Sequence, residues 1–289
     1  MKKILLPTDF SDNAWNAIVY ALEFFKNEEC EFYILHTYTP TFYRADYMIG
    51  GPMVSAIPDV GVEVAQAGLD KTLVDIKLKF KNPKHKFKTL SAFNMLTDEV
   101  QEVVEQKNID FVVMGTQGAA GAKEIFLGTH TVHVLRKSKI PVLVIPKKYK
   151  YQEIKSILFP TDYAIPYVKE DLNYIMDVAK MHNAKLTILN VKDDYSPTDS
   201  QIVNRKSLEV YFGALDYVVN QVKGKLMPDA IHEFIAQHNI GLLAMMNRKH
   251  SFLERLLIKP NVDSIGYHTQ IPFLVIRDTC EEPVKKRKS

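Results

Sequence analysis

Glycines that follow a short apolar run are the residues of this sequence whose spacing suggests chemistry. They are Gly115, Gly118, Gly121 and Gly128, and Thr129 comes directly after the last of them. Because glycine has no Cβ, several backbone N–H groups can converge on one anion. A helical pattern opens at Gly128, and the first N–H groups of a helix favour phosphate. The stretch therefore predicts a nucleotide-binding loop.

The spacing of these residues is G-x2-G-x9-G-T, counted from Gly115 to Thr129. It differs from the GxxxxGK[ST] phosphate loop and from the GxGxxG dinucleotide fingerprint. It resembles the nucleotide loop of the universal stress protein (UspA-like) family. The resemblance implies that Gly115, Gly118, Gly128 and Thr129 hold the phosphates of ATP, with or without Mg²⁺. The alternative interpretation is a glycine-rich turn that only connects a strand to a helix.

The same resemblance assigns residues to the adenosine end of the nucleotide. Asp9, in the sequence Pro7-Thr8-Asp9, is implied to bind the adenine and ribose, and the backbone of Thr37 is implied to border the adenine. Asp9 has a second interpretation as a cap for the helix that follows, although Ser11 could supply that cap equally well.

Three further residues complete the implied site. Met114 and Gln117 lie on either side of Gly115 in the sequence. His130 follows Thr129, where its ring either approaches the phosphates or faces solvent. Together with the residues above, they make up the expected nucleotide contacts.

Patterns for catalysis and metal binding are missing from the sequence. The nine histidines show no spacing that would bring together the three or four ligands that a metal site needs. No Ser-His-Asp or Cys-His arrangement is recognisable. The 115–121 loop has no lysine to neutralise charge in phosphoryl transfer, although Lys123 lies just beyond it. We therefore expect binding without a metal site and without a catalytic residue, and a slow ATPase is the alternative.

The elements that position the loop alternate between strands and helices. In the first half we expect strands near 3–7, 30–36, 86–92, 110–114 and 141–146, and helices near 12–27, 62–81, 96–107 and 128–137. Continuous apolar strands alternating with helices predict a doubly wound, parallel α/β sheet. Ligands bind such sheets beyond the carboxyl ends of the strands, where the strand order reverses. Pro7-Thr8-Asp9, His36-Thr37 and Met114-Gly115 all fall at such ends, so one crevice can hold them.

The second half of the chain repeats the first. Pro-Thr-Asp with a following aromatic residue occurs at 7–10 and again at 160–163, an offset of 153. Ile140-Pro141 recurs as Ile271-Pro272, an offset of only 131, so the first copy holds about 22 extra residues, from Thr37 to about Val60. In the second copy we expect strands near 155–159, 185–190, 215–222, 242–246 and 272–276, and helices near 167–182, 200–213, 227–238 and 260–267.

The repeat predicts two tandem α/β domains, each a five-stranded parallel sheet with helices on both faces. The resemblance implies that they are Rossmann-like, of the adenine nucleotide alpha hydrolase type. We place the domains at 1–147 and 154–279, joined by the short polar segment 147–153 and followed by a basic tail at 280–289. Two copies joined so tightly are expected to pack as a pseudo-twofold pair.

The second copy has lost the glycines. Met245-Met246-Asn247 stands where the first copy has Met114-Gly115-Thr116, Lys259-Pro260 replaces Gly128-Thr129, and no glycine occurs between Gly241 and Gly266. The 247–251 loop is basic instead, which indicates either an altered anion site or a solvated loop. Asp162 remains without a phosphate loop, so we expect nucleotide in the first copy only.

Composition excludes several other classes of protein. With 46% hydrophobic and 25% charged residues, the 289-residue chain has an ordinary globular composition. It has no apolar run of about 18 residues, so we expect no membrane span. The two cysteines favour a reducing cytoplasm over a disulfide framework. The net charge of +3 is too small to argue for nucleic acid, and we expect the 285–288 basic cluster to be a solvated tail.

These observations predict a cytoplasmic, ATP-binding regulatory or stress-resistance protein that acts through binding. A nucleotide-free interaction module is another alternative, with the aromatic-rich 37–60 insertion either as its contact surface, as a lid over adenine or as loop core. The family resemblance also implies that the last strand of each sheet, 141–145 and 272–276, pairs across a twofold axis. That pairing would form an intramolecular pseudo-dimer or a homodimer.

Overall fold

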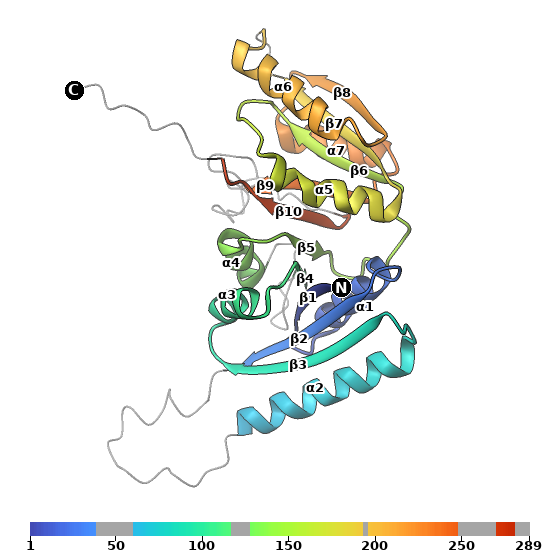
Figure 1. The fold of residues 1–289 in the computed structure, drawn as a ribbon, viewed down its shortest axis with the longest axis vertical. Helices are drawn as coiled ribbons and strands as arrows, with labels where there is room; N and C mark the ends of the chain where they lie inside the picture. The colour runs from blue at the N-terminus through green and yellow to red at the C-terminus, as the bar shows by residue number, and fades with distance from the viewer. Residues whose placement is uncertain (39–59, 117–127, 193–195, 248–269, 281–289) are drawn as a thin grey trace, which may run out of the picture. The chain divides into compact units, whose positions relative to one another are not determined.

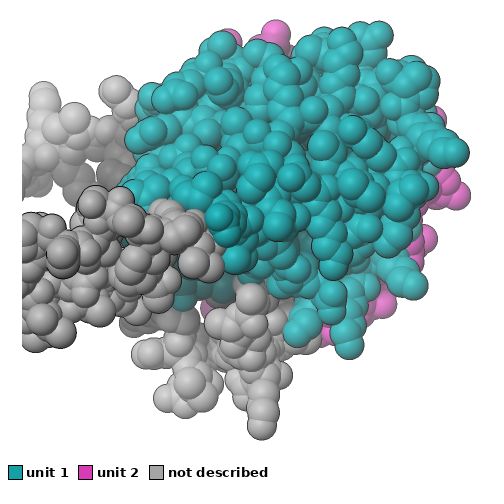
Figure 2. All heavy atoms as spheres, turned by 90° about the horizontal axis from the view of Figure 1, so that it is seen from below, with its two compact units in different colours: residues 1–151 teal, residues 152–289 magenta. Residues whose placement is uncertain are grey.

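The structure divides into two compact units, Met1–Tyr151 (unit 1) and Gln152–Ser289 (unit 2). It is a computed structural model that describes residues 1–38, 60–116, 128–192, 196–247 and 270–280. Unit 1 forms one continuous block of atoms in the space-filling view (Figure 2). The boundaries expected from the sequence, 147 and 154, fall on either side of this division.

Unit 1 is a five-stranded parallel sheet with helices on both faces (Figure 1). Its elements are β1 (Lys2–Pro7), α1 (Asp12–Phe24), β2 (Cys30–Tyr38), α2 (Val60–Lys79), β3 (His85–Phe93), α3 (Leu96–Lys107), β4 (Phe111–Gly115), α4 (Thr129–Lys137) and β5 (Val142–Ile145). The strands lie in the order β3-β2-β1-β4-β5, and every neighbouring pair is parallel. The predicted doubly wound fold is therefore confirmed, and the strand order reverses between β1 and β4.

The core of unit 1 explains where its elements begin and end. Apolar residues at every position make the central strands inaccessible on both faces, as in Ile4–Leu6 of β1. Ser11 starts α1 because its side chain accepts the Ala14 N–H. The helix ends at Phe24, earlier than the predicted residue 27, because the next residues form tight turns in which Lys26 N–H donates to the Glu23 carbonyl.

Unit 2 repeats this architecture. Its elements are β6 (Ser156–Thr161), α5 (Lys169–His182), β7 (Lys185–Lys192), α6 (Asp199–Phe212), β8 (Tyr217–Lys223), α7 (Met227–Gln237), β9 (Leu242–Asn247) and β10 (Phe273–Arg277). The strands lie in the order β8-β7-β6-β9-β10, and neighbouring strands are again parallel. The helix expected near 260–267 lies outside the described residues.

The pairing register shows that the repeat is structural as well as sequential. Pro7 of β1 lies opposite Leu35 of β2, and Pro160 of β6 lies opposite Leu189 of β7. The sequence repeat equates Pro7 with Pro160, and the register equates Leu35 with Leu189, an offset of 154 in place of 153. Residues at matching positions can therefore be compared directly between the two units.

Candidate functional site

Thr8, the residue that follows β1, is joined to the carboxyl-terminal half of β2 in unit 1. The Thr8 N–H donates to the Leu35 carbonyl at 2.8 Å, and the His36 Nδ1 atom lies 2.8 Å from the Thr8 carbonyl oxygen. Thr8 is itself buried. Asp9 and Thr37, the two residues predicted to contact the adenosine, directly follow Thr8 and His36 in the chain. These contacts therefore hold both of them at one edge of the sheet.

The turn after β1 has an uncommon backbone conformation. Phe10 has φ 62°, in the left-handed region that disfavours residues with a side chain. Two interactions support it: the Phe10 N–H donates to the Thr8 hydroxyl at 3.1 Å, and the Phe10 ring stacks on His36 with ring centroids 4.3 Å apart. Strained backbone of this kind persists only where its surroundings impose it.

The structure shows which of Asp9 and Ser11 caps helix α1. The Ser11 hydroxyl caps α1 and donates to the Asp9 carboxylate at 2.6 Å. The Ser11 N–H also donates to that carboxylate, at 3.1 Å. The capping side chain is therefore Ser11, and Asp9 orients it from an exposed position at the sheet edge.

Gly115 ends β4 at a point where α1 packs closely against the strand. A Cβ on Gly115 would lie 2.3 Å from the Asn13 side-chain nitrogen, which is far inside normal contact. Its carbonyl accepts the Thr131 hydroxyl of α4 at 2.9 Å. The glycine therefore serves packing between α1 and β4, in addition to the predicted anion contact.

A backbone hydrogen bond holds the start of α4 beside the end of β4. The Gly128 N–H donates to the Thr116 carbonyl at 2.5 Å, and the Thr116 N–H donates to the Ile145 carbonyl of β5 at 3.1 Å. Gly128 is the N-cap residue of α4, and it has no side chain with which to cap the helix. The N–H groups of the first turn and the positive end of the helix dipole are therefore presented beside the carboxyl edge of the sheet.

The predicted site residues that the structure describes all lie at this edge, from the ends of β1, β2 and β4 to the start of α4. They are Pro7, Thr8, Asp9, Thr37, Met114, Gly115, Gly128, Thr129 and His130. Met114 is buried in the sheet, so only its backbone is available to a ligand. His130 is exposed in the first turn of α4. Gln117, Gly118, Gly121 and Lys123 lie outside the described residues.

The sequence interpretation missed several residues that build this edge. Phe10 had a recognisable signal, because an aromatic residue follows Pro-Thr-Asp in both copies. Asn13 and Thr131 had none, since their contacts with β4 come from helices that meet the strand only in three dimensions. The supporting role of His36 likewise depends on the pairing of β1 with β2.

The matching edge of unit 2 keeps the left-handed turn. Tyr163 has φ 58°, and its N–H donates to the Thr161 hydroxyl at 2.9 Å. The Ala164 N–H donates to the Asp162 carboxylate at 2.9 Å, as Ser11 does to Asp9 in unit 1. The turn therefore belongs to both units and does not by itself mark a ligand site.

Other side chains tie down this edge in unit 2. The Tyr167 hydroxyl contacts the Thr161 hydroxyl, and α6 supplies Gln201, which donates to the Asp162 carbonyl at 2.9 Å. Tyr163 is buried, and burial raises the pKa of its hydroxyl to about 12. Met246 ends the run that Gly115 ends in unit 1. In the described part of this edge, the side chains of Tyr167 and Gln201 therefore hold the turn in place.

The described ranges show neither a metal-binding cluster nor a membrane-spanning helix. They contain no group of three or more His, Cys, Asp or Glu side chains placed to hold a metal ion. None of their helices combines the length and the apolar character needed to cross a membrane.

Comparison with known proteins gives matches in both units. The model of the universal stress protein family matches residues 1–146 and 153–277. Universal stress protein MJ0577 of Methanocaldococcus jannaschii is 28% identical over 155 residues, covering 51% of this chain and 96% of the relative. Universal stress protein YxiE of Bacillus subtilis is 28% identical over 145 residues, covering 50% and 97%.

The fold also matches a solved structure over nearly its whole length. The crystal structure of a universal stress protein from Archaeoglobus fulgidus aligns with a TM-score of 0.67 and 20% sequence identity. The alignment covers 95% of this chain and 98% of that one. At this identity, the similarity speaks for the fold alone.

Proposed function

Because this chain belongs to the universal stress protein family, which both of its halves match, we propose that unit 1 binds ATP and that unit 2 does not. In this proposal Asp9 and Thr37 contact the adenosine, and Gly115, Gly118 and Gly128 leave room for the phosphates. The Thr129 hydroxyl and nearby N–H groups donate to the phosphate oxygens. The protein then acts as a nucleotide-responsive regulator.

The observation that carries the proposal is the hydrogen bond between the Gly128 N–H and the Thr116 carbonyl. It sets the uncapped start of α4 against the end of β4, one strand away from the Thr8-Asp9 turn. An anion at the start of α4 and an adenosine at Asp9 would then share one edge of the sheet. This is also the position at which doubly wound sheets bind their ligands.

The way α1 is held supports a regulatory role. The helix begins at Asp12, directly after the turn that contains Asp9. One helical turn later, the Asn16 side chain donates to the Tyr149 carbonyl at 3.0 Å, near the end of unit 1. A ligand that favours one position of the turn would therefore favour one position of the chain leaving unit 1, provided that its affinity differs between the two.

Isothermal titration of the full chain with ATP tests the proposal. Gly128 has φ −61° and ψ 149°, a conformation open to any residue, so Gly128→Val should fold while its side chain blocks the phosphates. We expect the variant to bind ATP at least about 100-fold more weakly, which corresponds to about 2.7 kcal/mol. Titrations with Mg²⁺ and with EDTA show whether the metal accompanies the nucleotide.

Gly213→Val is the matched control, because Gly213 in unit 2 also has an ordinary negative φ, −59°. It should bind ATP as the unsubstituted chain does. An unsubstituted chain that shows no binding at millimolar ATP, or equal binding by both variants, would contradict the proposal. Sustained release of ADP, lost in Asp9→Ala, would instead indicate the slow ATPase.

A further inference from the structure

Helix α2 is apolar on two opposite sides. Its buried residues recur every three or four positions and face the sheet, at Ala65, Leu69, Thr72 and Ile76. The opposite side carries three large apolar side chains that are mostly exposed: Val64 at 59%, Val74 at 55% and Leu78 at 71%. A helix that is apolar on both sides is usually covered on both.

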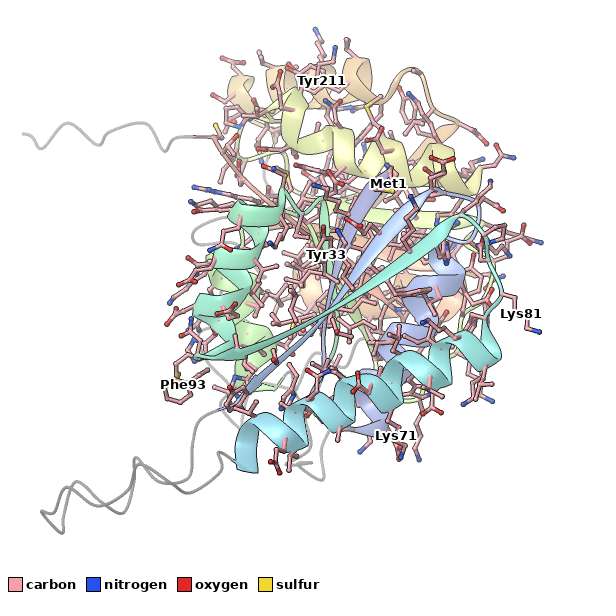
Figure 3. The ribbon with its side chains drawn as sticks, turned by 60° about the horizontal axis from the view of Figure 1, so that its bottom comes forward. Met1, Tyr33, Lys71, Lys81, Phe93 and Tyr211 are labelled. Atoms are coloured by element: carbon pink, nitrogen blue, oxygen red, sulfur yellow. The ribbon has the colours of Figure 1, made fainter. Side chains whose placement is uncertain are left out.

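The outward apolar residues follow the spacing of a coiled coil. Val64, Ala67, Lys71, Val74 and Leu78 alternate steps of three and four residues, which is the a and d pattern of a heptad repeat. Figure 3 shows Lys71 projecting from the side of α2 that faces away from the sheet. A single lysine among apolar a and d positions is a common device for fixing the register of paired helices.

We propose that α2 pairs with α2 of a second copy of this chain, in antiparallel orientation about a twofold axis. The charged residues of α2 favour a second α2 as the partner and an antiparallel orientation of the two helices. Glu63 near the start of α2 and Lys77 near its end occupy the same heptad position, beside the apolar line. Antiparallel pairing places each Glu63 beside Lys77 of the second copy, twice. Parallel pairing would instead place Asp70 beside Asp75 of the second copy, which is repulsive.

The apolar residues are complementary in the same register. Val64 lies opposite Val74 of the second copy, and the small side chain of Ala67 lies opposite Lys71. The aliphatic stem of Lys71 can then cover the alanine while its ammonium group stays in water. The layers thus match in size without any change in the backbone of α2.

The flanking charges are available for this contact. In the part of the chain that the structure describes, neither Glu63 nor Lys77 has an ion-pair partner. Lys79, by contrast, lies over the Trp15 ring, 4.9 Å from its centroid. The Lys77 ammonium is therefore the one in this turn that can reach across to a second copy.

One pair in this arrangement opposes association. Asp70 lies at the twofold axis and faces Asp70 of the second copy, with its carboxylate held by the Gln66 side chain at 3.0 Å. A helix of 20 residues is also only about 30 Å long, so the buried area is smaller than in a standard stable interface. The dimer should therefore form in a concentration-dependent way.

Sedimentation velocity of the full chain over a concentration series tests the pairing. Val74→Glu should weaken association roughly tenfold or more, because a buried charge would face Val64 of the second copy. Val210→Glu is the matched control, since Val210 is 76% exposed on α6, the corresponding helix of unit 2. A chain that is monomeric throughout, or equal weakening by both variants, would overturn the proposal.

Charge variants test the direction of pairing. Glu63→Lys and Lys77→Glu should each weaken association by roughly threefold, and the double variant should restore it. Asp70→Asn should strengthen association, because it removes the like charges at the axis and keeps an oxygen for Gln66. Failure of the double variant to recover, or weaker association in Asp70→Asn, would rule out the antiparallel arrangement.

Discussion

The carboxyl edges of the two units share one turn and differ in the residues that pack around it. Phe10 and Tyr163 both have a positive φ, and in both units the preceding threonine hydroxyl accepts their N–H. Beyond the turn, unit 1 has Gly115 and an uncapped helix start, whereas unit 2 has Met246 and a tyrosine hydroxyl. The comparison shows that the turn is a property of the fold, and that the glycines are a separate feature of unit 1.

The glycine and its neighbour change together between the units. In unit 1, Gly115 makes room for Asn13 of α1. In unit 2 the matching residues are Met246 and Pro166, and α5 begins only at Lys169. A larger strand residue therefore occurs with a later helix start, and the intervening chain brings Tyr167 onto Thr161. One close approach of helix to strand accounts for several differences between the edges.

Among substitutions that test this difference between the units, we expect Gly115→Ala to have the largest effect on stability. Gly115→Ala places a methyl group against the Asn13 side chain, so we expect unit 1 to lose roughly 1–3 kcal/mol of stability. Trp15 is the only tryptophan of the chain and lies in unit 1, so its fluorescence during urea unfolding reports that unit. Met246→Leu in unit 2 conserves volume and should cost less than about 1.5 kcal/mol.

The double variant Asn13→Ala/Gly115→Ala separates overpacking from other causes. If the methyl group collides with Asn13, the double variant should be more stable than the sum of the single changes predicts. Additive losses would show that Gly115 is needed for another reason, such as the backbone path into the loop.

Asp9 and Asp162, at matching positions of the two turns, test whether only the turn of unit 1 binds a ligand. Asp9→Ala and Asp162→Ala each remove a carboxylate that accepts the N–H two residues later, so both should cost about 1 kcal/mol of stability. Only Asp9→Ala should weaken ATP binding, by about tenfold or 1.4 kcal/mol, in the same titration. Equal ATP binding by the two variants would remove Asp9 from the proposed site.

Tyr167 tests how unit 2 holds its edge without the glycines. Tyr167→Phe removes the hydroxyl that contacts Thr161 and should lower the stability of unit 2 by about 1 kcal/mol. Thermal unfolding followed by far-ultraviolet circular dichroism should register this loss, while the Trp15 signal from unit 1 stays unchanged. A shift of the Trp15 signal would mean that the two units do not unfold separately.

The smallest effect concerns Glu31, a buried carboxylate of β2 in unit 1. Lys88 and the Tyr33 hydroxyl both donate to Glu31 and hold the pKa of its carboxyl below the ordinary value. This contribution to stability is therefore present above the ordinary pKa and is lost as the pH falls through the lowered one. Glu31→Gln should flatten the acid side of the stability profile measured with Trp15.

Lys185 is the control, because it occupies the matching strand position of unit 2 and is exposed. Lys185→Gln should leave the acid side of the profile unchanged. A Glu31→Gln profile that still falls as steeply in acid would mean that other carboxylates determine it.

The fold was predictable because the lengths and spacing of the apolar runs determine where strands and helices form. The strand Phe111–Gly115 and the helix Leu96–Lys107 lie within one or two residues of their expected bounds. The end of α1 was less predictable, because Phe25 and Lys26 continue the helical pattern while local turns stop the helix. Tertiary contacts, rather than propensity, decide such ends.

The candidate site was only partly predictable. The spacing of the glycines predicts an anion-binding loop, and the family resemblance assigns Gly115, Gly128 and Thr129 to the phosphates; both assignments stay predictions. The contact between Gly115 and Asn13 could not be predicted, because it joins residues from different elements. Tyr167 was missed for the same reason, since nothing in its own sequence neighbourhood indicates that its hydroxyl meets Thr161.

The left-handed turn that recurs at residues 10 and 163 has a consequence for how such chains diversify. The hydrogen bonds that support it come from residues before the fourth strand of each unit, including Gln201 of α6 in unit 2, so none of them depends on the chain that follows that strand. The loop after that strand is therefore a replaceable part, and a duplicated gene can trade it for another chemistry in one half while the other half keeps the inherited one.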